Sequence, residues 1–498
     1  MKKKLILVIS FIIFLLITNI YFPFFNTIDS IKINSKSTQE FINDDLLREK
    51  SLNFLIENSK DKYSQTFLSF QINDFSNIRK EYLFNHIESS IQVSKDRIEE
   101  GVFTENQFLN YILPYRLRYE SLEDWRTLAI QNYGGLFSDD IFKQVKNIND
   151  SLKTIFNFTG SSFPNRKLSN LLDNCNGGCY EMSDIAAFTM RANGIPVAID
   201  FAKWSNIAGE HQWNALILKD KNSPFMGIES DPNPKIDSLG NETEPETLKI
   251  FTDYKRFAKV YRQSFLKYEK FESDFNPKQI ISKVNYIDVT KEYCNDVKDI
   301  KLKFGSDLNE NDLVYLCVYE NNFWVPVDYS YYKNNTLFFK DVCVNNVFIL
   351  RKKVNEKLEY FNNPFTFNQQ GEITFRKPSK TNFENLKLSF FNSKEREVMK
   401  LLKRGLKFSE EVKLIKRILE DNITGFIHKD STYNLFIWDK KWVKINEAKG
   451  EDGFINFKNI PENALYKLED INDATAYRNR CFTIDSTFIQ NWWVPILY

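Results

Sequence analysis

The chain has 498 residues and nearly equal numbers of basic and acidic side chains, 67 Lys and Arg against 66 Asp and Glu, for a formal net charge of +1. This balance argues against a nucleic-acid partner, because binding along a phosphate backbone relies on excess positive charge. Aromatic residues make up 15% of the chain, which argues against disorder, and six cysteines are too few for a disulfide scaffold of this length. An imidazole base can come only from His86, His211 or His428.

The first 25 residues predict a signal peptide or an N-terminal membrane anchor. Lysines at positions 2–4 precede an apolar run from Leu5 to Ile17, which continues with few polar interruptions to Phe25. A basic start before such a run is typical of an export signal, and about 20 apolar residues also suffice to cross a bilayer. No clear cleavage site follows. We therefore expect an exported protein, periplasmic or at the cell surface, that is either secreted or held in the membrane through residues 5–25.

Residues 26–135 predict a polar, helical region without recognisable chemistry. Leucines and isoleucines between Leu46 and Ile56 recur mostly at three- to five-residue spacing, which is typical of one apolar helix face. His86 lies among polar residues here, and we expect it at the surface, as we do His428. The region is interpreted as a supporting helical layer.

Residues 136–275 predict an α+β domain. A turn-forming stretch at 174–178 precedes a predicted helix over 179–193, and Gly194 and Pro196 stand where a helix-ending glycine and a following proline belong. The pattern then predicts strands over 197–204, 211–218 and 225–230, with a hairpin loop over 219–224.

The C-terminal part contains an internal repeat with a shift of 118 residues, held without gaps over about 36 positions. Each copy alternates apolar and polar residues, which predicts antiparallel strands with one buried face. We expect two β-sandwich-like modules, one over 280–376 and one after a linker region within 377–498, where 393–421 is predicted to be helical. The identities include Tyr315 with Tyr433, Trp324 with Trp442, and Phe339 with Phe457.

Cys179 is the candidate nucleophile. It lies at the predicted start of a helix, directly after two glycines, and helix N-terminal amides favour an anion. We therefore expect a stabilised thiolate with a lowered pKa, beside amides that can hold an oxyanion. His211 begins a strand 32 residues later and is the candidate base.

A carboxylate should orient that base. If the hairpin that follows His211 centres near Lys221, Asp231 lies opposite His211, and Glu229 shares the same face two residues earlier. Asp231 is therefore the predicted third member of a triad, with Glu229 as the alternative acid.

These residues resemble the transglutaminase-like superfamily of papain-fold cysteine enzymes, over about residues 140–270. The matching motifs are Gly-Cys at 178–179, Arg-Ala-Asn-Gly-Ile-Pro at 191–196, His-Gln-Trp-Asn at 211–214 and Asp-Pro at 231–232. Phe225 stands where that family usually has a tryptophan. The resemblance implies a papain/transglutaminase-like core and a Cys-His-Asp triad that hydrolyses or transfers an amide of a protein, peptide or cell wall. The layout also resembles large exported bacterial transglutaminase-domain proteins.

Several alternatives stay open. A Cys175–Cys179 disulfide would silence the site. A zinc site at these cysteines and His211 would lack the four protein ligands of a structural centre, so no metal or cofactor is expected. The alternative function is a non-catalytic surface binding or scaffold protein, with a vestigial transglutaminase-like domain and carbohydrate-binding β-modules. Trp324 and Trp442 are interpreted as core anchors of their modules rather than as sugar-stacking platforms.

Overall fold

The fold is of the mixed α+β class, as the sequence predicts. Residues 1–25 and 393–421, together with Glu229, Asp231 and His428, lie outside the described residues. None of the described helices is both long and apolar enough to span a membrane. The computed structural model describes residues 42–65, 71–159, 166–205, 210–225, 235–236, 242–243, 257–266, 285–305, 308–320, 323–354, 357–389, 427, 429–451, 454–472, 481–484 and 490–492.

Short helices form the first layer, and several begin at a side-chain cap. The Thr104 hydroxyl accepts from the Gln107 amide in a capping box, and Asp124 caps the next helix. The apolar faces of most of these helices share one core, whereas Trp125, Ala129 and Tyr133 belong to the core around residues 179–192. The elements are α2 (Ile42–Asn58), β1 (Tyr63–Gln65), β2 (Gln71–Asn73), α3 (Asp74–Asn77), α4 (Lys80–Gln92), α5 (Lys95–Glu99), α6 (Glu105–Tyr111) and α7 (Trp125–Tyr133).

The prediction that His86 lies at the surface is wrong. Helix α4 turns this residue inward, where its exposed fraction is 4%. Its Nε2 lies 2.8 Å from the Leu113 carbonyl oxygen, and its ring packs against Tyr82 and the edge of Trp125. A buried imidazole so surrounded is a packing element, which leaves His211 and His428 as the candidate bases.

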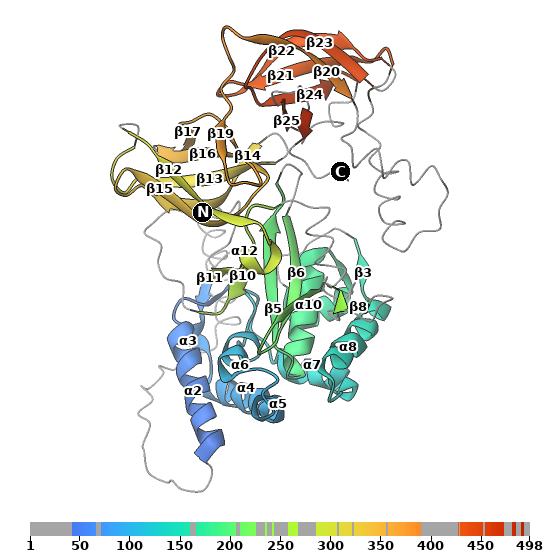
Figure 1. The fold of residues 1–498 in the computed structure, drawn as a ribbon. Helices are drawn as coiled ribbons and strands as arrows, with labels where there is room; N and C mark the ends of the chain where they lie inside the picture. Colours follow the sequence, from blue (N-terminus) through green and yellow to red (C-terminus); the bar gives the residue numbers. More distant parts are fainter. Residues whose placement is uncertain are drawn as a thin grey trace, which may run out of the picture.

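A five-stranded antiparallel sheet forms the centre of the molecule, and α10 (Cys179–Ala192) packs on β5 and β6 (Figure 1). Ile185 and alanines of α10 share one apolar core with Val197 and Ile199 of β5. The strands run in the order β11-β10-β5-β6-β7: β5 (Val197–Lys203), β6 (Glu210–Ile217), β7 (Asn222–Phe225), β10 (Tyr261–Ser264) and β11 (Asn285–Asp288). Around them lie η1 (Gly134–Leu136), α8 (Ile141–Ile155), β3 (Asn157–Phe158), α9 (Leu168–Asn174), β4 (Asn176–Gly177), β8 (Lys235–Ile236) and β9 (Glu242–Thr243).

The end of α10 follows the sequence prediction closely. Gly194 adopts a φ of +70°, and its amide donates to the Arg191 carbonyl. The Ile195 amide donates to the Met190 carbonyl, which completes a Schellman motif. The helix therefore ends at a glycine that the backbone requires.

The hairpin after His211 has a different register from the predicted one. Asn214 pairs with Phe225 and Ile217 with Asn222, so the turn lies at residues 219–220 rather than around Lys221. Cross-strand partners are thereby displaced by three residues. An odd displacement exchanges the two faces of a strand, so the arithmetic that placed Asp231 opposite His211 does not hold.

The sheet also takes in residues beyond 275. Strand β11 lies within the range expected for the first β-module, yet it pairs with β10 at the edge of the central sheet. The short helix α12 (Thr290–Tyr293) follows it and contacts β15 (Thr336–Cys343) of that module. Figure 1 shows α12 between the central sheet and the module.

Two β-modules with the same strand order follow. In each, two sheets enclose one apolar core, and the strand containing Tyr315 or Tyr433 lies between two neighbours. In the first, β12 (Val297–Lys303) pairs with β15 (Thr336–Cys343) opposite the sheet of β14 (Phe323–Tyr331), β13 (Leu313–Glu320), β16 (Asn346–Val354), β18 (Phe365–Phe367) and β19 (Ile373–Phe375), with β17 (Lys357–Tyr360) on β16. In the second, β20 (Phe383–Ser389) pairs with β23 (Phe454–Pro461) opposite β22 (Trp442–Lys449), β21 (Thr432–Trp438), β24 (Tyr466–Asp470), β25 (Cys481–Ile484) and β26 (Gln490–Trp492).

The repeated tryptophans lie where the modules meet. Trp324 packs edge-on against Trp438 at 5.5 Å, and Trp442 packs against Tyr319 at the same ring separation. They belong to an apolar cluster shared by both modules, separate from the core inside each. Trp324 is buried, as expected of a core residue, but the core that holds both tryptophans joins the two modules and is not the interior of a single module.

Candidate active site

Cys179 is the first residue of α10, with Gly178 as its N-cap. The preceding Gly177 has a φ of +155°, and a Cβ there would lie 2.5 Å from the Glu181 Cβ. The backbone amide of Gln212, the residue after His211, is hydrogen-bonded to the Cys179 sulfur. The structure thus brings the thiol to β6 at the position next to the predicted base.

The pKa of the Cys179 thiol is raised, contrary to the prediction. Burial is the main cause, and the nearby Glu181 and Glu210 carboxylates add to it, while the Gln212 amide acts in the opposite direction. Glu181 is fully buried, and its Oε2 accepts from the Gly178 amide at 3.0 Å. A carboxylate already occupies the helix N-terminus, so the thiol of the resting protein is neutral.

Replacing Glu181 by glutamine should make Cys179 more reactive. E181Q removes the negative charge but keeps an oxygen that can accept from the Gly178 amide. We expect the pKa of Cys179 to fall and its alkylation by iodoacetamide at pH 7 to become roughly threefold to tenfold faster. Peptide mass spectrometry measures the rate at each cysteine.

The matched control is Asp173→Asn. Asp173 helps to raise the pKa of Cys175, and burial is the larger cause there. D173N should therefore accelerate alkylation of Cys175 and leave Cys179 unchanged. Equal rates at Cys179 in E181Q and the unmodified protein would refute the role assigned to the Glu181 charge.

His211 lies between two indole rings. Trp204 and Trp213 have ring centroids 5.7 and 5.9 Å from the imidazole and lie within 25° of parallel to it. His211 is opposite Ala202 on β5, so the two tryptophans flank it in opposite directions along the sheet. The imidazole plane is set by this stack.

The side chains of β6 alternate between the two faces of the sheet. Gln212 donates to the Asp184 Oδ1 at 3.2 Å and Asn214 to the Ser183 carbonyl at 3.1 Å, so both face α10. His211 and Trp213 therefore lie on the opposite face. The backbone of β6 thus lies between the His211 ring and α10, and the Gln212 amide is the point at which Cys179 contacts that strand.

Sequence reasoning missed Arg118 and Tyr180, which tie the helical layer to this site. The Arg118 guanidinium donates to the Gln212 amide oxygen and to Asp184, the latter at 3.1 Å. The guanidinium carbons of Arg118 and Arg166 lie 5.5 and 5.2 Å from the centre of the Tyr180 ring, and Tyr180 donates to Glu210. In the sequence, the one sign of a role for Tyr180 is its position directly after Cys179.

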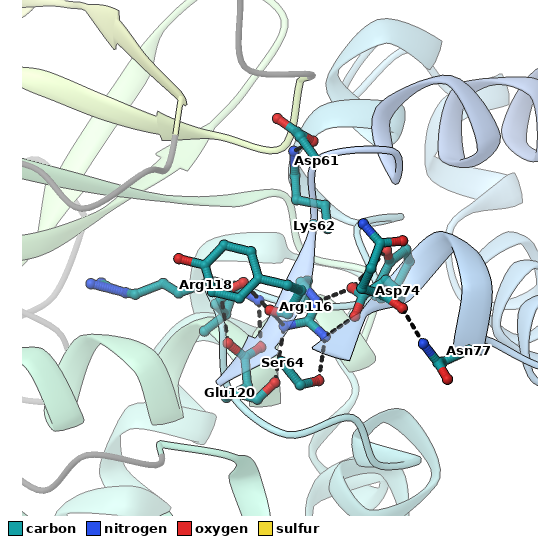
Figure 2. Close-up of polar contacts among 12 residues, drawn as sticks. Asp61, Lys62, Ser64, Asp74, Asn77, Arg116, Arg118 and Glu120 are labelled. Atoms are coloured by element: carbon teal, nitrogen blue, oxygen red, sulfur yellow. Dashed lines mark hydrogen bonds and ion pairs between the residues drawn. The ribbon is translucent and has the colours of Figure 1, made fainter. Parts of the chain in front are cut away.

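Arg118 is positioned in turn by the structure around Arg116 (Figure 2). Arg116 is buried and donates to the backbone carbonyl oxygens of Tyr63 and Glu120 and to Asp74. The Glu120 carboxylate accepts from the amides of residues 117 and 118. This network fixes the backbone from which Arg118 reaches α10.

Three further expectations concern a disulfide, a metal site and the orienting acid. Cys175 and Cys179 are both free thiols, and the Cys175 sulfur donates to the Leu172 carbonyl at 2.6 Å. Among the described residues, no three His, Cys, Asp or Glu side chains gather to hold a metal ion. Asp231 and Glu229 lie outside the described residues, so the choice of orienting acid stays a prediction.

Comparison with known proteins adds little to this geometry. No family model matches the chain, and no curated protein matches it. Among solved structures, the transglutaminase of red sea bream is similar over 72% of this chain and 71% of that one, with 7% sequence identity and a TM-score of 0.19. A likeness at that TM-score carries no argument about activity, which has to be drawn from the residues themselves.

Proposed function

We propose that the chain is an exported, cysteine-dependent amide hydrolase or acyl transferase of transglutaminase-like type. Its nucleophile is Cys179 and its base is His211, with Asp231 or Glu229 as the orienting carboxylate. The observation that carries the proposal is the contact of the Cys179 sulfur with the Gln212 amide, directly beside His211 on β6. The substrate would be an amide of a protein, a peptide or the cell wall.

The chemistry follows from a neutral resting thiol. His211 takes the thiol proton as the sulfur attacks the amide carbonyl, and it returns the proton to the leaving amine. The backbone N–H of Gln212 lies beside the sulfur and can donate a hydrogen bond to the oxyanion. Water or a second amine then releases the acyl group from the thioester. Proton transfer between the sulfur and the imidazole would take place at the start of β6, with the ring held by the stack of Trp204 and Trp213.

The second candidate is a non-catalytic scaffold, and the raised pKa of Cys179 favours it. Trp324 is 1% exposed and therefore offers no surface for glycan stacking, whereas Trp442 is half-buried. Phe323, on the same strand as Trp324, is 66% exposed and is available for stacking.

The test compares Cys179→Ala with Cys175→Ala in the full chain. Cys175 is a matched control, since it is a free thiol four residues away, on the other side of the glycine turn. Turnover is measured on glutamine-containing peptides, both as ammonia release and as incorporation of a fluorescent primary amine. C179A should lose at least about a thousandfold in rate, as expected for removal of a nucleophile, and C175A should keep the original rate.

Turnover by C179A at the original rate would overturn the proposal. Absence of turnover in the unmodified protein, together with retention of the full chain on immobilised peptidoglycan, would establish the scaffold function instead.

A further inference from the structure

A buried chain of hydrogen bonds lies beneath Trp213. The Trp213 Nε1 donates to the Tyr293 hydroxyl at 2.9 Å, and that hydroxyl donates to Asp200 Oδ2. Arg262 donates to both Asp200 oxygens at 2.8 Å and to the Glu292 carboxylate. Trp213 and Asp200 have no exposed surface, and Tyr293 and Arg262 are each 3% exposed.

The direction of every bond in this chain is fixed by chemistry. The indole nitrogen can only donate, an ionised carboxylate can only accept, and a guanidinium can only donate. The Tyr293 hydroxyl therefore has to accept from Trp213 and donate to Asp200. The pKa of Tyr293 is well above its ordinary value because of burial and the Asp200 charge, so the hydroxyl keeps its proton.

This arrangement fixes the orientation of Trp213. Besides the hydrogen bond, the Tyr293 ring packs edge-on against the indole at 5.2 Å and 78°. Trp213 in turn stacks on His211, whose other face meets Trp204. A change at Tyr293 thus reaches the imidazole through one intervening side chain.

We propose that Tyr293, Asp200 and Arg262 are positioning residues for His211, acting through Trp213. The inference rests on the proposed function, in which His211 is the base. Tyr293 comes from α12, outside the range 136–275 that the sequence assigns to the catalytic domain, and Arg262 comes from β10. A displacement of about 1 Å between reacting groups can cost a hundredfold in rate, so a rigid support for the imidazole has a direct catalytic consequence.

The test is Tyr293→Phe in the full chain, with Tyr261→Phe as the matched control. Y293F keeps the ring against Trp213 but removes the hydroxyl. Tyr261 is half-buried in the same sheet, and its hydroxyl donates to the Val327 carbonyl at 2.8 Å, outside this chain of bonds. One readout is the imidazole NMR signal of His211 in 13C-histidine-labelled protein, which contains only three histidines. The other is the alkylation rate of Cys179 at pH 7.

In Y293F we expect the His211 signal to shift while the His86 signal stays in place, and Cys179 alkylation to slow by about tenfold or more. Y261F should change neither. An unmoved His211 signal with unchanged alkylation in Y293F would overturn the inference.

His211→Ala separates this outcome from failure of the proposed function. Unchanged Cys179 alkylation in H211A would refute His211 as the base, whereas the His211 signal in Y293F would still decide whether Tyr293 positions the imidazole.

Discussion

Replacing Gly194 by alanine is expected to destabilise the central domain by roughly 2–5 kcal/mol, through left-handed backbone strain and forced overpacking. Its φ is +70°, and an added Cβ would lie 2.0 Å from the Val93 carbonyl oxygen. That neighbour is backbone at the end of α4, so it cannot turn aside as a flexible side chain would. Calorimetry should show a melting temperature lower by roughly 5–15 °C.

Gly135→Ala is the matched control for this prediction. A Cβ at Gly135 meets no atom within 4 Å, and its φ lies outside the left-handed region. G135A should therefore change the free energy of unfolding by no more than about 0.5 kcal/mol. Similar melting temperatures for G194A and G135A would contradict the assigned clash.

Replacing Arg116 by methionine should cost about 3–5 kcal/mol of stability at pH 8, because it leaves the Asp74 carboxylate buried without its counter-charge. The Arg116 Nε lies 2.6 Å from Asp74 Oδ2, and both side chains are 1% exposed. The substitution also deprives the Tyr63 and Glu120 carbonyl oxygens of a donor. Thermal unfolding of the full chain at several pH values measures the effect.

The deficit of R116M should shrink as the pH falls. Burial raises the pKa of Asp74 to about 6, above its ordinary value of 3.8, even with Arg116 present. The folded state therefore binds the proton more readily than the unfolded state, and stability from this group is lost as the pH rises from about 4 to 6. Without Arg116, the protonated form of Asp74 is favoured further in the folded state. Lowering the pH therefore increases the stability of R116M more than that of the unmodified protein.

Arg48→Met provides the comparison. Arg48 pairs with Glu88 at a surface where the two side chains are 38% and 49% exposed. Exposed pairs contribute about 0–1 kcal/mol, so R48M should melt close to the unmodified protein at every pH. If R116M loses the same amount of stability relative to the unmodified protein at every pH, the role assigned to Asp74 is refuted.

Local signals in the sequence predicted local structure well. Gly194 and Pro196 marked the end of α10, and the glycines at 177 and 178 marked its start, because backbone geometry restricts which residues can occupy those places. The strands predicted directly after that helix end likewise match β5 and β6 closely.

The electrostatics of the site could not be predicted in the same way. A helix start suggests a lowered cysteine pKa, but whether another anion already occupies it depends on the Glu181 rotamer and on burial. The turn of the hairpin was predicted near Lys221 but lies at residues 219–220, and this error displaced every predicted cross-strand partner.

Contacts between distant segments were the hardest to foresee. The inward turn of His86 depends on Leu113 and Trp125, which are distant in the sequence, whereas Tyr82 lies one helical turn away on α4. Trp324 and Trp442 looked like module cores because a repeat shows what two copies share and not how they meet.

Strand β11 lies late in the chain but belongs to the central sheet, and this has a consequence for folding during synthesis. Strand β11 pairs only after residues 285–288 have emerged, and Tyr293 follows them. Until then, the β10 edge and the Trp213 nitrogen have no partner from this segment. The order of synthesis thus delays completion of the candidate site until the first β-module begins to form, so a ribosome-bound fragment ending at 275 should lack the support for its predicted base.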